Sequence, residues 1–122
     1  MNPEQIAAEA YPMLDDILGR IGLHKTGTPL RFGDLREPFN HWIEEQVVSQ
    51  ADYAFMVSLV GAFICESLIQ QAGGARRVVG RKIFLTMPVT AGVLREFDPY
   101  EVASSVVQMR AKLSAFLATF AS

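Results

Sequence analysis

Apolar residues recur at helical spacing in four segments of this chain, and a segment with β character separates the third from the fourth. In the first segment, from Ile6 to Ile21, apolar residues return every three or four positions. Asn2 and Gln5 have the spacing of a capping box before it, and Gly22 follows it as a stop signal. Pro12 removes a backbone donor, so we expect either a kinked helix or two short helices there.

The second helical segment follows a connector over residues 24–35, where Gly27, Pro29 and Gly33 interrupt any regular pattern. We expect the helix to begin at Pro38, because proline suits the first turn of a helix. Its apolar residues fall on one face, and these are Phe39, Trp42, Ile43 and Val47.

The third helical segment, Tyr53–Gln71, is apolar on nearly every side, which is typical of a helix buried by its neighbours. Gly61 and Ala62 are small, so another element is expected to approach closely there. Gly73-Gly74 ends the helix. Because the apolar stretch is short for a membrane span and carries Glu66, we interpret it as a core helix.

The segment after the third helix is the part of the chain richest in strand-forming residues. It predicts an antiparallel meander of two or three strands, with turns at Gly80-Arg81 and Ala91-Gly92. The expected strands are residues 77–79, 82–87 and 93–97. Pro88 cannot donate to a ladder, so we expect it at a strand end or on an edge strand.

The last helical segment opens with Asp98-Pro99-Tyr100-Glu101, which combines a capping residue, a first-turn proline and an acid at capping-box spacing. Apolar residues then recur at spacings of three and four, which predicts one helix with a narrow apolar seam. The seam consists of Val102, Val106, Met109, Leu113, Phe116 and Phe120. Together the segments predict an α+β fold, mostly helical, with about four helices around a buried central helix plus a small antiparallel β meander.

The composition indicates a single domain over residues 1–122, because 50% of the residues are apolar and 20% are charged. The net charge of −2 gives no overall attraction to nucleic acid or to anionic lipid. The single cysteine cannot form an internal disulfide, and the polar N-terminal residues do not resemble a secretory signal. We therefore expect a cytoplasmic protein that does not enter a membrane.

Residues that often carry chemistry are few in this sequence. His24 and His41 have no cysteine or second histidine at ligand spacing, whereas a zinc site needs three or four ligands. We expect His24 in a loop and His41 on a helix surface. Cys65 lies inside the apolar third helix, a setting that does not favour the thiolate. The sequence therefore predicts no catalytic residue, no metal site and no cofactor, and it favours a protein without enzymatic activity.

Glu66 is the acid with the most interpretations, because it lies in a strongly apolar helix. If it is buried, its pKa would rise, and a buried carboxylate can mark a functional site. Helical geometry also groups it with Asp52 and Gln70 on one stripe that would reach solvent. The third interpretation is a structural salt bridge to an arginine of the β segment. The stripe and the salt bridge are favoured over catalysis.

Arg76, Arg77, Arg81 and Lys82 form the one local cluster of basic residues, and they are candidates for binding a partner. Three helices before a basic hairpin is the order of a winged helix-turn-helix. A recognition helix must present polar side chains to the DNA groove, however, and the third helix is too apolar for this. A strand edge guarded by charge is the common explanation. Contacts with phosphate, with an acidic partner or with acids of neighbouring helices are the alternatives.

One combination of motifs resembles small uncharacterised bacterial domains. Gly61-Ala62-Phe63-Ile64-Cys65-Glu66 precedes Gly73-Gly74, a short meander, and Asp98-Pro99-Tyr100 before a final helix. The resemblance covers roughly residues 50–120, and Ala75-Arg76-Arg77 stands where such domains often have a tryptophan. Some of these domains are thought to act as immunity or accessory proteins, so the resemblance implies such a role and no catalytic residue.

Three functions follow as hypotheses. The favoured one is a non-enzymatic accessory protein that binds or regulates another protein or a second copy of itself, because two apolar stripes, Phe39–Val47 and Val102–Phe120, need covering. The second is a small ligand-binding protein or enzyme that uses Glu66 in a pocket. The third is a nucleic-acid accessory protein that uses the basic hairpin, which the overall charge disfavours.

Overall fold

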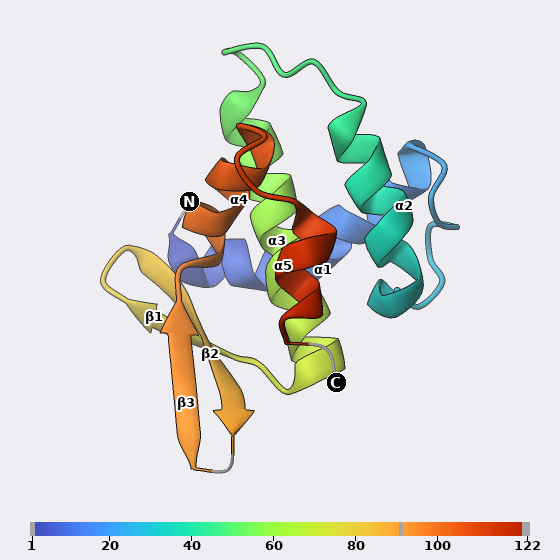
Figure 1. Ribbon diagram of the computed structural model, residues 1–122. Coiled ribbons are helices and arrows are strands. Elements are labelled where there is room, and N and C mark those ends of the chain that lie inside the picture. The colour runs from blue at the N-terminus through green and yellow to red at the C-terminus, as the bar shows by residue number, and fades with distance from the viewer. Residues whose placement is uncertain (1, 91, 121–122) are drawn as a thin grey trace.

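The computed structural model describes residues 2–90 and 92–120, which form a mostly helical α+β fold (Figure 1). The predicted fold class is therefore confirmed. Within these ranges the elements are α1 (Pro3–Arg20), α2 (Phe32–Glu44), α3 (Tyr53–Ala72), β1 (Ala75–Val79), β2 (Lys82–Thr90), β3 (Val93–Phe97), α4 (Pro99–Val107) and α5 (Leu113–Ala118).

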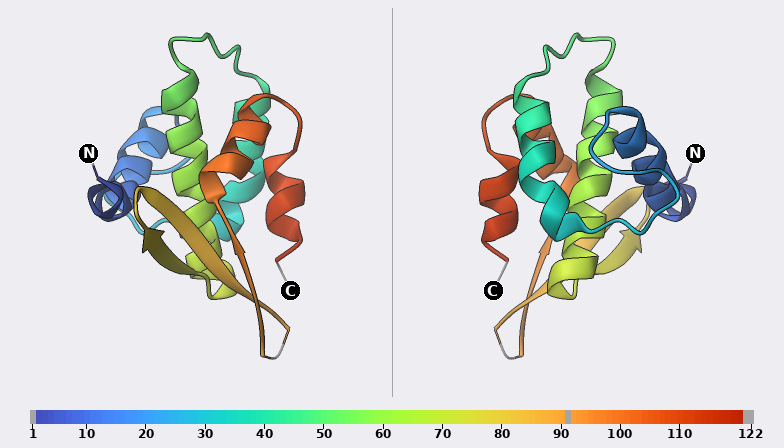
Figure 2. Two further views of the ribbon diagram at one scale, coloured as in Figure 1. Left: turned by 90° about the vertical axis from the view of Figure 1, so that its left-hand side faces the viewer. Right: turned by 90° about the vertical axis from the view of Figure 1, so that its right-hand side faces the viewer.

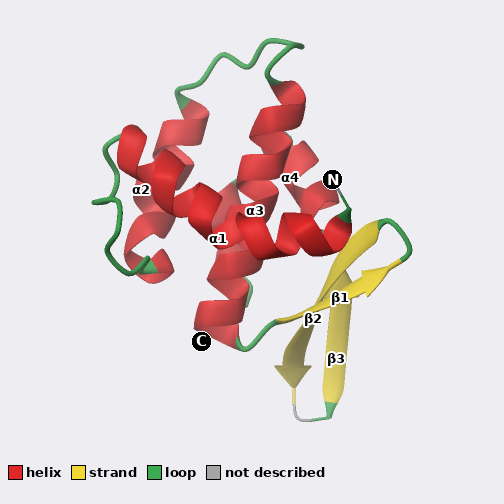
Figure 3. Ribbon diagram, turned by 180° about the vertical axis from the view of Figure 1, so that it is seen from behind, coloured by secondary structure: helices red, strands yellow, loops and turns green. Residues whose placement is uncertain are grey.

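Helix α3 is the centre around which the other described elements pack. Figure 1 shows α2 on one side of α3 and α4 on the other, and Figure 3 shows α1 crossing its far side. In Figure 2, α1 and α5 lie on opposite sides of α3. The three-stranded sheet lies beside the end of α3 and extends beyond the helices, so one end of the sheet is free of helical cover.

The composition of α3 follows from this central position. Half of its residues are buried, and they include Leu59, Phe63 and Leu68. Gly73 ends the helix in the left-handed conformation (φ 73°), and the amide of Gly74 bonds to the carbonyl of Leu68, as the sequence predicts. Among the described residues α3 alone has the length and hydropathy of a membrane span, which is weak evidence because a buried core helix has the same composition.

Helix α1 begins with the predicted capping box. The side-chain oxygen of Asn2 accepts from the amide of Gln5 at 2.8 Å, and the Gln5 side chain accepts from the amide of Asn2 at 2.9 Å. The helix continues through Pro12 to Arg20, so the alternative of two short helices is wrong.

Helix α2 begins at Phe32, well before Pro38, so the predicted start is wrong. The cause is tertiary: the side chain of Gln70 on α3 accepts from the amide of Phe32 at 2.9 Å and donates to the carbonyl of Leu30 at 2.8 Å. Phe32 is buried beneath this contact. The helix ends at Glu44, which leaves Val47 beyond it and 99% exposed, so Val47 does not belong to the buried apolar face.

The sheet is an antiparallel meander in the order β1-β2-β3, as predicted. Arg76 pairs with Leu85 across the first two strands, and Leu85 pairs with Phe97 across the second and third.

Pro88 lies inside the central strand, so its predicted place at an end or edge is wrong. The register is irregular between Pro88 and Thr90, and a bulge tolerates a residue that cannot donate. Ala91 of the second predicted turn lies outside the described residues.

The last helical segment forms two helices rather than the single one predicted. Helix α4 ends at Val107, Met109 has a φ of 60°, and α5 begins at Leu113. The break lets α5 pack against α2, where the side-chain oxygen of Asn40 accepts from the amide of Ser114 at 3.1 Å. Asn40 thereby caps α5 from another helix, a contact that no local pattern reveals.

Candidate functional site

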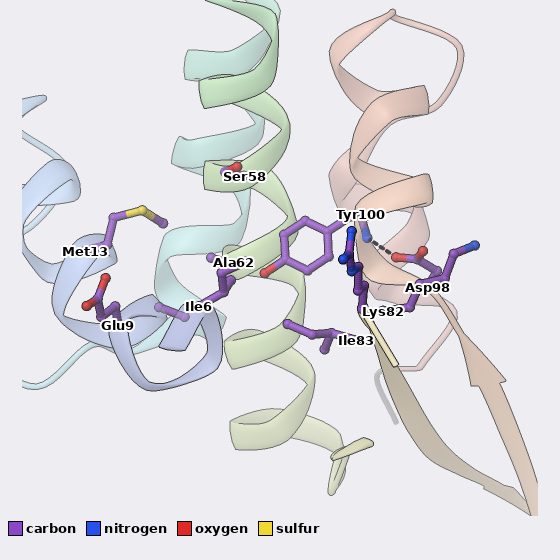
Figure 4. Close-up of a pocket in the computed structure, with 11 residues that line it drawn as sticks. Ile6, Glu9, Met13, Ser58, Ala62, Lys82, Ile83, Asp98 and Tyr100 are labelled. Carbon is purple, nitrogen blue, oxygen red and sulfur yellow. Dashed lines mark hydrogen bonds between the residues drawn. The ribbon is translucent and has the colours of Figure 1, made fainter. Parts of the chain in front are cut away.

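A cavity of about 480 Å³ lies between α1, α3, the β1–β2 turn and the start of α4 (Figure 4). Ile6 and Met13 of α1, Ala62 of α3 and Ile83 of β2 supply its apolar walls. Tyr100 reaches in from the start of α4, and its hydroxyl points toward α3 and α1. Four separate parts of the chain therefore enclose one concave, mainly apolar space.

Two small residues, Ala10 of α1 and Ala62 of α3, line the cavity, whereas the neighbouring Gly61 is covered by Tyr100. A Cβ atom on Gly61 would lie 2.3 Å from Cδ1 of Tyr100, so the tyrosine ring packs directly on the backbone of Gly61. The expectation that another element approaches α3 at this point is confirmed. Ala10 and Ala62 are buried but short, and Tyr100 fills only part of the space in front of them.

Charged side chains stand around the cavity. Arg81 lies in the β1–β2 turn, Lys82 is the first residue of β2, and both are exposed. Glu9 lies across the cavity on α1 (Figure 4). Asp98 caps α4, because its carboxylate accepts from the amides of Tyr100 at 2.9 Å and of Glu101 at 3.4 Å. The helix start thus supplies hydrogen-bond donors to the carboxylate of Asp98, as the capping pattern predicts.

Glu66 forms an ion pair with Arg76 of β1, and its side chain is 13% exposed. The predicted salt bridge between Glu66 and an arginine of the β segment is therefore confirmed. Glu66 is not among the residues that line the cavity, so the structure gives no support to a pocket carboxylate at this position. The pair joins α3 to the sheet and is a structural element.

The four residues of the basic cluster differ in their contacts. Arg76 is paired with Glu66, and Arg77 binds both carboxylate oxygens of Glu96 on β3 at 2.8 and 2.5 Å. This contact lowers the pKa of the Glu96 carboxyl below its ordinary value. Among the described residues, Arg81 and Lys82 have no acid within ion-pair distance, so they alone of the four remain available to a partner.

Cys65 and Tyr100 are the two groups near the cavity with raised pKa values. Burial raises the pKa of the Cys65 thiol to about 11. Burial also raises the pKa of the Tyr100 phenol to about 12, and the neighbouring Cys65 adds to this effect. Both groups are protonated at neutral pH, so Tyr100 offers a hydrogen-bond donor and Cys65 is no thiolate nucleophile.

A second polar cluster lies where the loop after α1 folds back. Nε2 of His24 lies 2.5 Å from the carboxylate of Asp15, and the same carboxylate accepts from the amide of Gly27 at 3.1 Å. Nδ1 of His24 is 3.4 Å from the hydroxyl of Thr28. That hydroxyl donates to the carbonyl of Lys25 at 2.6 Å, so its one proton is engaged elsewhere. The cluster clamps the loop to α1.

The side chain of His24 is 5% exposed, whereas His41 lies on the surface of α2 beside Glu45, as predicted. Within residues 2–90 and 92–120, no group of three or more His, Cys, Asp or Glu side chains is placed to hold a metal ion.

Sequence reasoning did not find the cavity, because its walls come from segments that are far apart in the chain. Ile6 and Met13 have the spacing of an ordinary amphipathic helix, and nothing local marks them as cavity residues. The signal that was present is Gly61 inside an apolar helix, which indicates a close approach by another element. The partner in that approach, Tyr100, was assigned only to a helix start.

Comparisons with known proteins found no matching family model, no significantly similar curated protein and no significantly similar solved structure.

Proposed function

We propose that this protein is a non-enzymatic binding protein that takes a small, mainly apolar ligand into the cavity between α1, α3, β2 and α4. The observation that carries the proposal is the cavity itself. Its volume of about 480 Å³ falls in the range of small-molecule sites, and apolar walls with a few polar groups at one side are typical of such sites. The proposal keeps the ligand-binding hypothesis but replaces Glu66 with Tyr100 and the residues of the β1–β2 turn.

The hypothesis of an accessory protein that binds another protein rested on two apolar stripes. Phe39 and Ile43 of the first stripe and Val106 and Leu113 of the second are buried in the core. The exposed large apolar side chains are distributed over α1, the α2–α3 loop, α3, the sheet and the α4–α5 connection, and these are Tyr11, Val47, Phe55, Val78, Val79, Leu94 and Met109. The stripes therefore no longer argue for a protein partner, and the cavity is the stronger basis.

A nucleic-acid function would need several free cations on one face. Arg76 and Arg77 are engaged by Glu66 and Glu96, which leaves only Arg81 and Lys82 from the cluster. Two cations at the mouth of an apolar cavity fit a small ligand better than a phosphate backbone.

The test is binding of an uncharged probe, 1-decanol, followed by chemical-shift changes in ¹H–¹⁵N spectra. We expect the largest shifts at the amides of the cavity residues, including Ala62 and Tyr100. Ser58 lines the cavity from an exposed position on α3, so Ser58→Phe is expected to block the cavity while leaving the core intact. Ser58→Ala is the matched control and should bind like the wild type. Shifts elsewhere, or unchanged binding by Ser58→Phe, would overturn the proposal.

A further inference from the structure

We infer that the ligand of this cavity carries an anionic group, which Arg81 and Lys82 bind at the β1–β2 turn while its apolar body lies against α1 and α3. This inference rests on the proposed function and adds the chemical class of the ligand: an apolar acid with one negatively charged end.

The first argument is that the basic residues of this hairpin differ in whether they have an ion-pair partner. Arg76 is paired with Glu66 and Arg77 with Glu96, so both cations of β1 already have an acidic partner. Arg81 lies in the turn after β1 and Lys82 begins β2, and both line the cavity without an ion-pair partner among the described residues. An external anion would give Arg81 and Lys82 the kind of ion-pair partner that the two arginines of β1 already have.

The second argument is the distribution of acids around the cavity. Asp98 lies close to the turn, but its carboxylate already accepts two amides at the start of α4. Glu9 is the remaining acid, and it stands on α1, on the other side of Tyr100 from Lys82 (Figure 4). With Arg81 and Lys82 against the single carboxylate of Asp98, the turn end of the cavity carries a net positive charge, and the α1 end carries the negative charge of Glu9, so an anionic ligand has one favoured orientation.

The third argument is the wall between these two ends. Ile6, Met13, Ala62 and Ile83 present apolar surface, which favours a hydrocarbon or aromatic body over a sugar or nucleotide. The Tyr100 hydroxyl points into this space and is protonated at neutral pH, so it can donate a hydrogen bond there. A ligand with an apolar body and one acidic end would bury its body against the apolar wall and place its charge beside the cations at the turn.

The experiment compares three probes that share one tail and differ in head charge: decanoate, 1-decanol and decyltrimethylammonium, each below its micellar concentration. Binding to the full chain is measured by isothermal titration calorimetry at low and at moderate salt. We expect decanoate to bind most tightly and decyltrimethylammonium least tightly. The double variant Arg81→Ala, Lys82→Ala should lose about five- to tenfold in affinity for decanoate, since two partly exposed ion pairs contribute that much.

The matched control is the double variant Arg110→Ala, Lys112→Ala, which removes two exposed cations of the α4–α5 connection that do not line the cavity. It should bind all three probes like the wild type. Added salt should weaken decanoate binding and leave decanol binding unchanged.

The outcomes separate the inference from the function on which it rests. Equal affinity for decanoate and decanol, both blocked by Ser58→Phe, would overturn the anionic assignment and leave the binding function standing. Tightest binding of the cationic probe would also overturn it, because Glu9 would then dominate the cavity. Failure of all three probes to bind would overturn the proposed function and the inference together.

Discussion

The two sides of α3 are packed in different ways. On the side of α2, Phe63 stacks on Phe39 with ring centroids 4.3 Å apart and meets Phe32 edge-on at 5.3 Å, and all three rings are buried. On the side of the sheet and α4, Tyr100 covers Gly61, and Ala62 beside it presents only a methyl group to a cavity of about 480 Å³. The helix therefore packs against stacked aromatic rings toward α2 and borders a local cavity toward α1, β2 and the start of α4.

This difference comes from the size of the residues and not from their polarity. Both sides of α3 are apolar, so a hydrophobic pattern treats them alike. Aromatic rings fill the space between α3 and α2, because protein interiors pack as densely as organic crystals. On the opposite side the Tyr100 ring fills the space over Gly61, but Ala62 is too short to fill the space beside it. Small residues within a core helix thus indicate where a ligand site can form.

The largest expected effect on stability comes from removing a buried aromatic ring between α3 and α2. Phe63→Ala should lower the free energy of unfolding by about 3–5 kcal/mol, since it opens a void among buried rings. Met13→Ala, on the cavity wall, should cost only about 1 kcal/mol, because Met13 already borders open space. Urea denaturation of both variants measures the contrast, and equal losses would contradict the difference between the two sides.

The next effect tests the polar link between α3 and the sheet. Glu66→Gln leaves the guanidinium of Arg76 without its partner in a site where the two side chains are only 13% and 25% exposed. We expect a loss of about 2–3 kcal/mol, somewhat less than for a fully buried pair.

The double variant Glu66→Leu, Arg76→Met serves as the control for that pair. It replaces both charges with apolar groups and should recover most of the lost stability. If Glu66→Gln were as stable as the wild type, the pair would contribute nothing to the attachment of the sheet.

A smaller effect is expected where Tyr100 rests on α3. Gly61→Ala would ordinarily stabilise the interior of a helix by about 1 kcal/mol. Here the new Cβ would lie 2.3 Å from the Tyr100 ring, so the ring must move, and we expect a net loss of about 1–2 kcal/mol. In a Tyr100→Ala background the same change should become stabilising. A loss that persists without the tyrosine would show that the ring is not the obstacle.

The sequence predicted those features that depend on neighbouring residues. The capping box at Asn2, the left-handed stop at Gly73 and the cap at Asp98 are all present, because each is made within one turn of the chain. The extent of α3 was also predicted almost to the residue, since its apolar run and its glycine stop are both local signals.

The features that sequence reasoning missed are made by contacts between distant elements. Gln70 fixes the start of α2 ahead of Pro38, and Asn40 caps α5 after a break that the regular seam conceals. The cavity is the extreme case, because its walls come from α1, α3, the sheet and α4. The basic cluster was visible as a group, but only the positions of Glu66 and Glu96 distinguish its paired members from its free ones.

The smallest effect concerns two carboxylates near the surface, the half-buried Asp15 on α1 and the exposed Glu96 on β3. Asp15 holds the loop that leads to α2, and Glu96 holds Arg77 on the sheet. The hydrogen bond from His24 lowers the pKa of the Asp15 carboxyl below its ordinary value, and the bond from Arg77 does the same for Glu96. A lowered folded-state pKa stabilises the protein above the unfolded-state value, and this stabilisation is lost as the pH falls through the folded-state value.

We therefore expect the urea midpoint to fall from about pH 4.5 downward, in part through these two groups. Asp15→Asn should remove the part of this slope that begins near pH 4, and Glu96→Gln the part that begins slightly higher. Both effects should shrink with added salt, because the carboxylates lie at the surface. A slope that both variants leave unchanged would mean that other carboxylates govern the acid transition. Neither the Asp15–His24 contact nor the Arg77–Glu96 contact would then contribute to the pH dependence of stability.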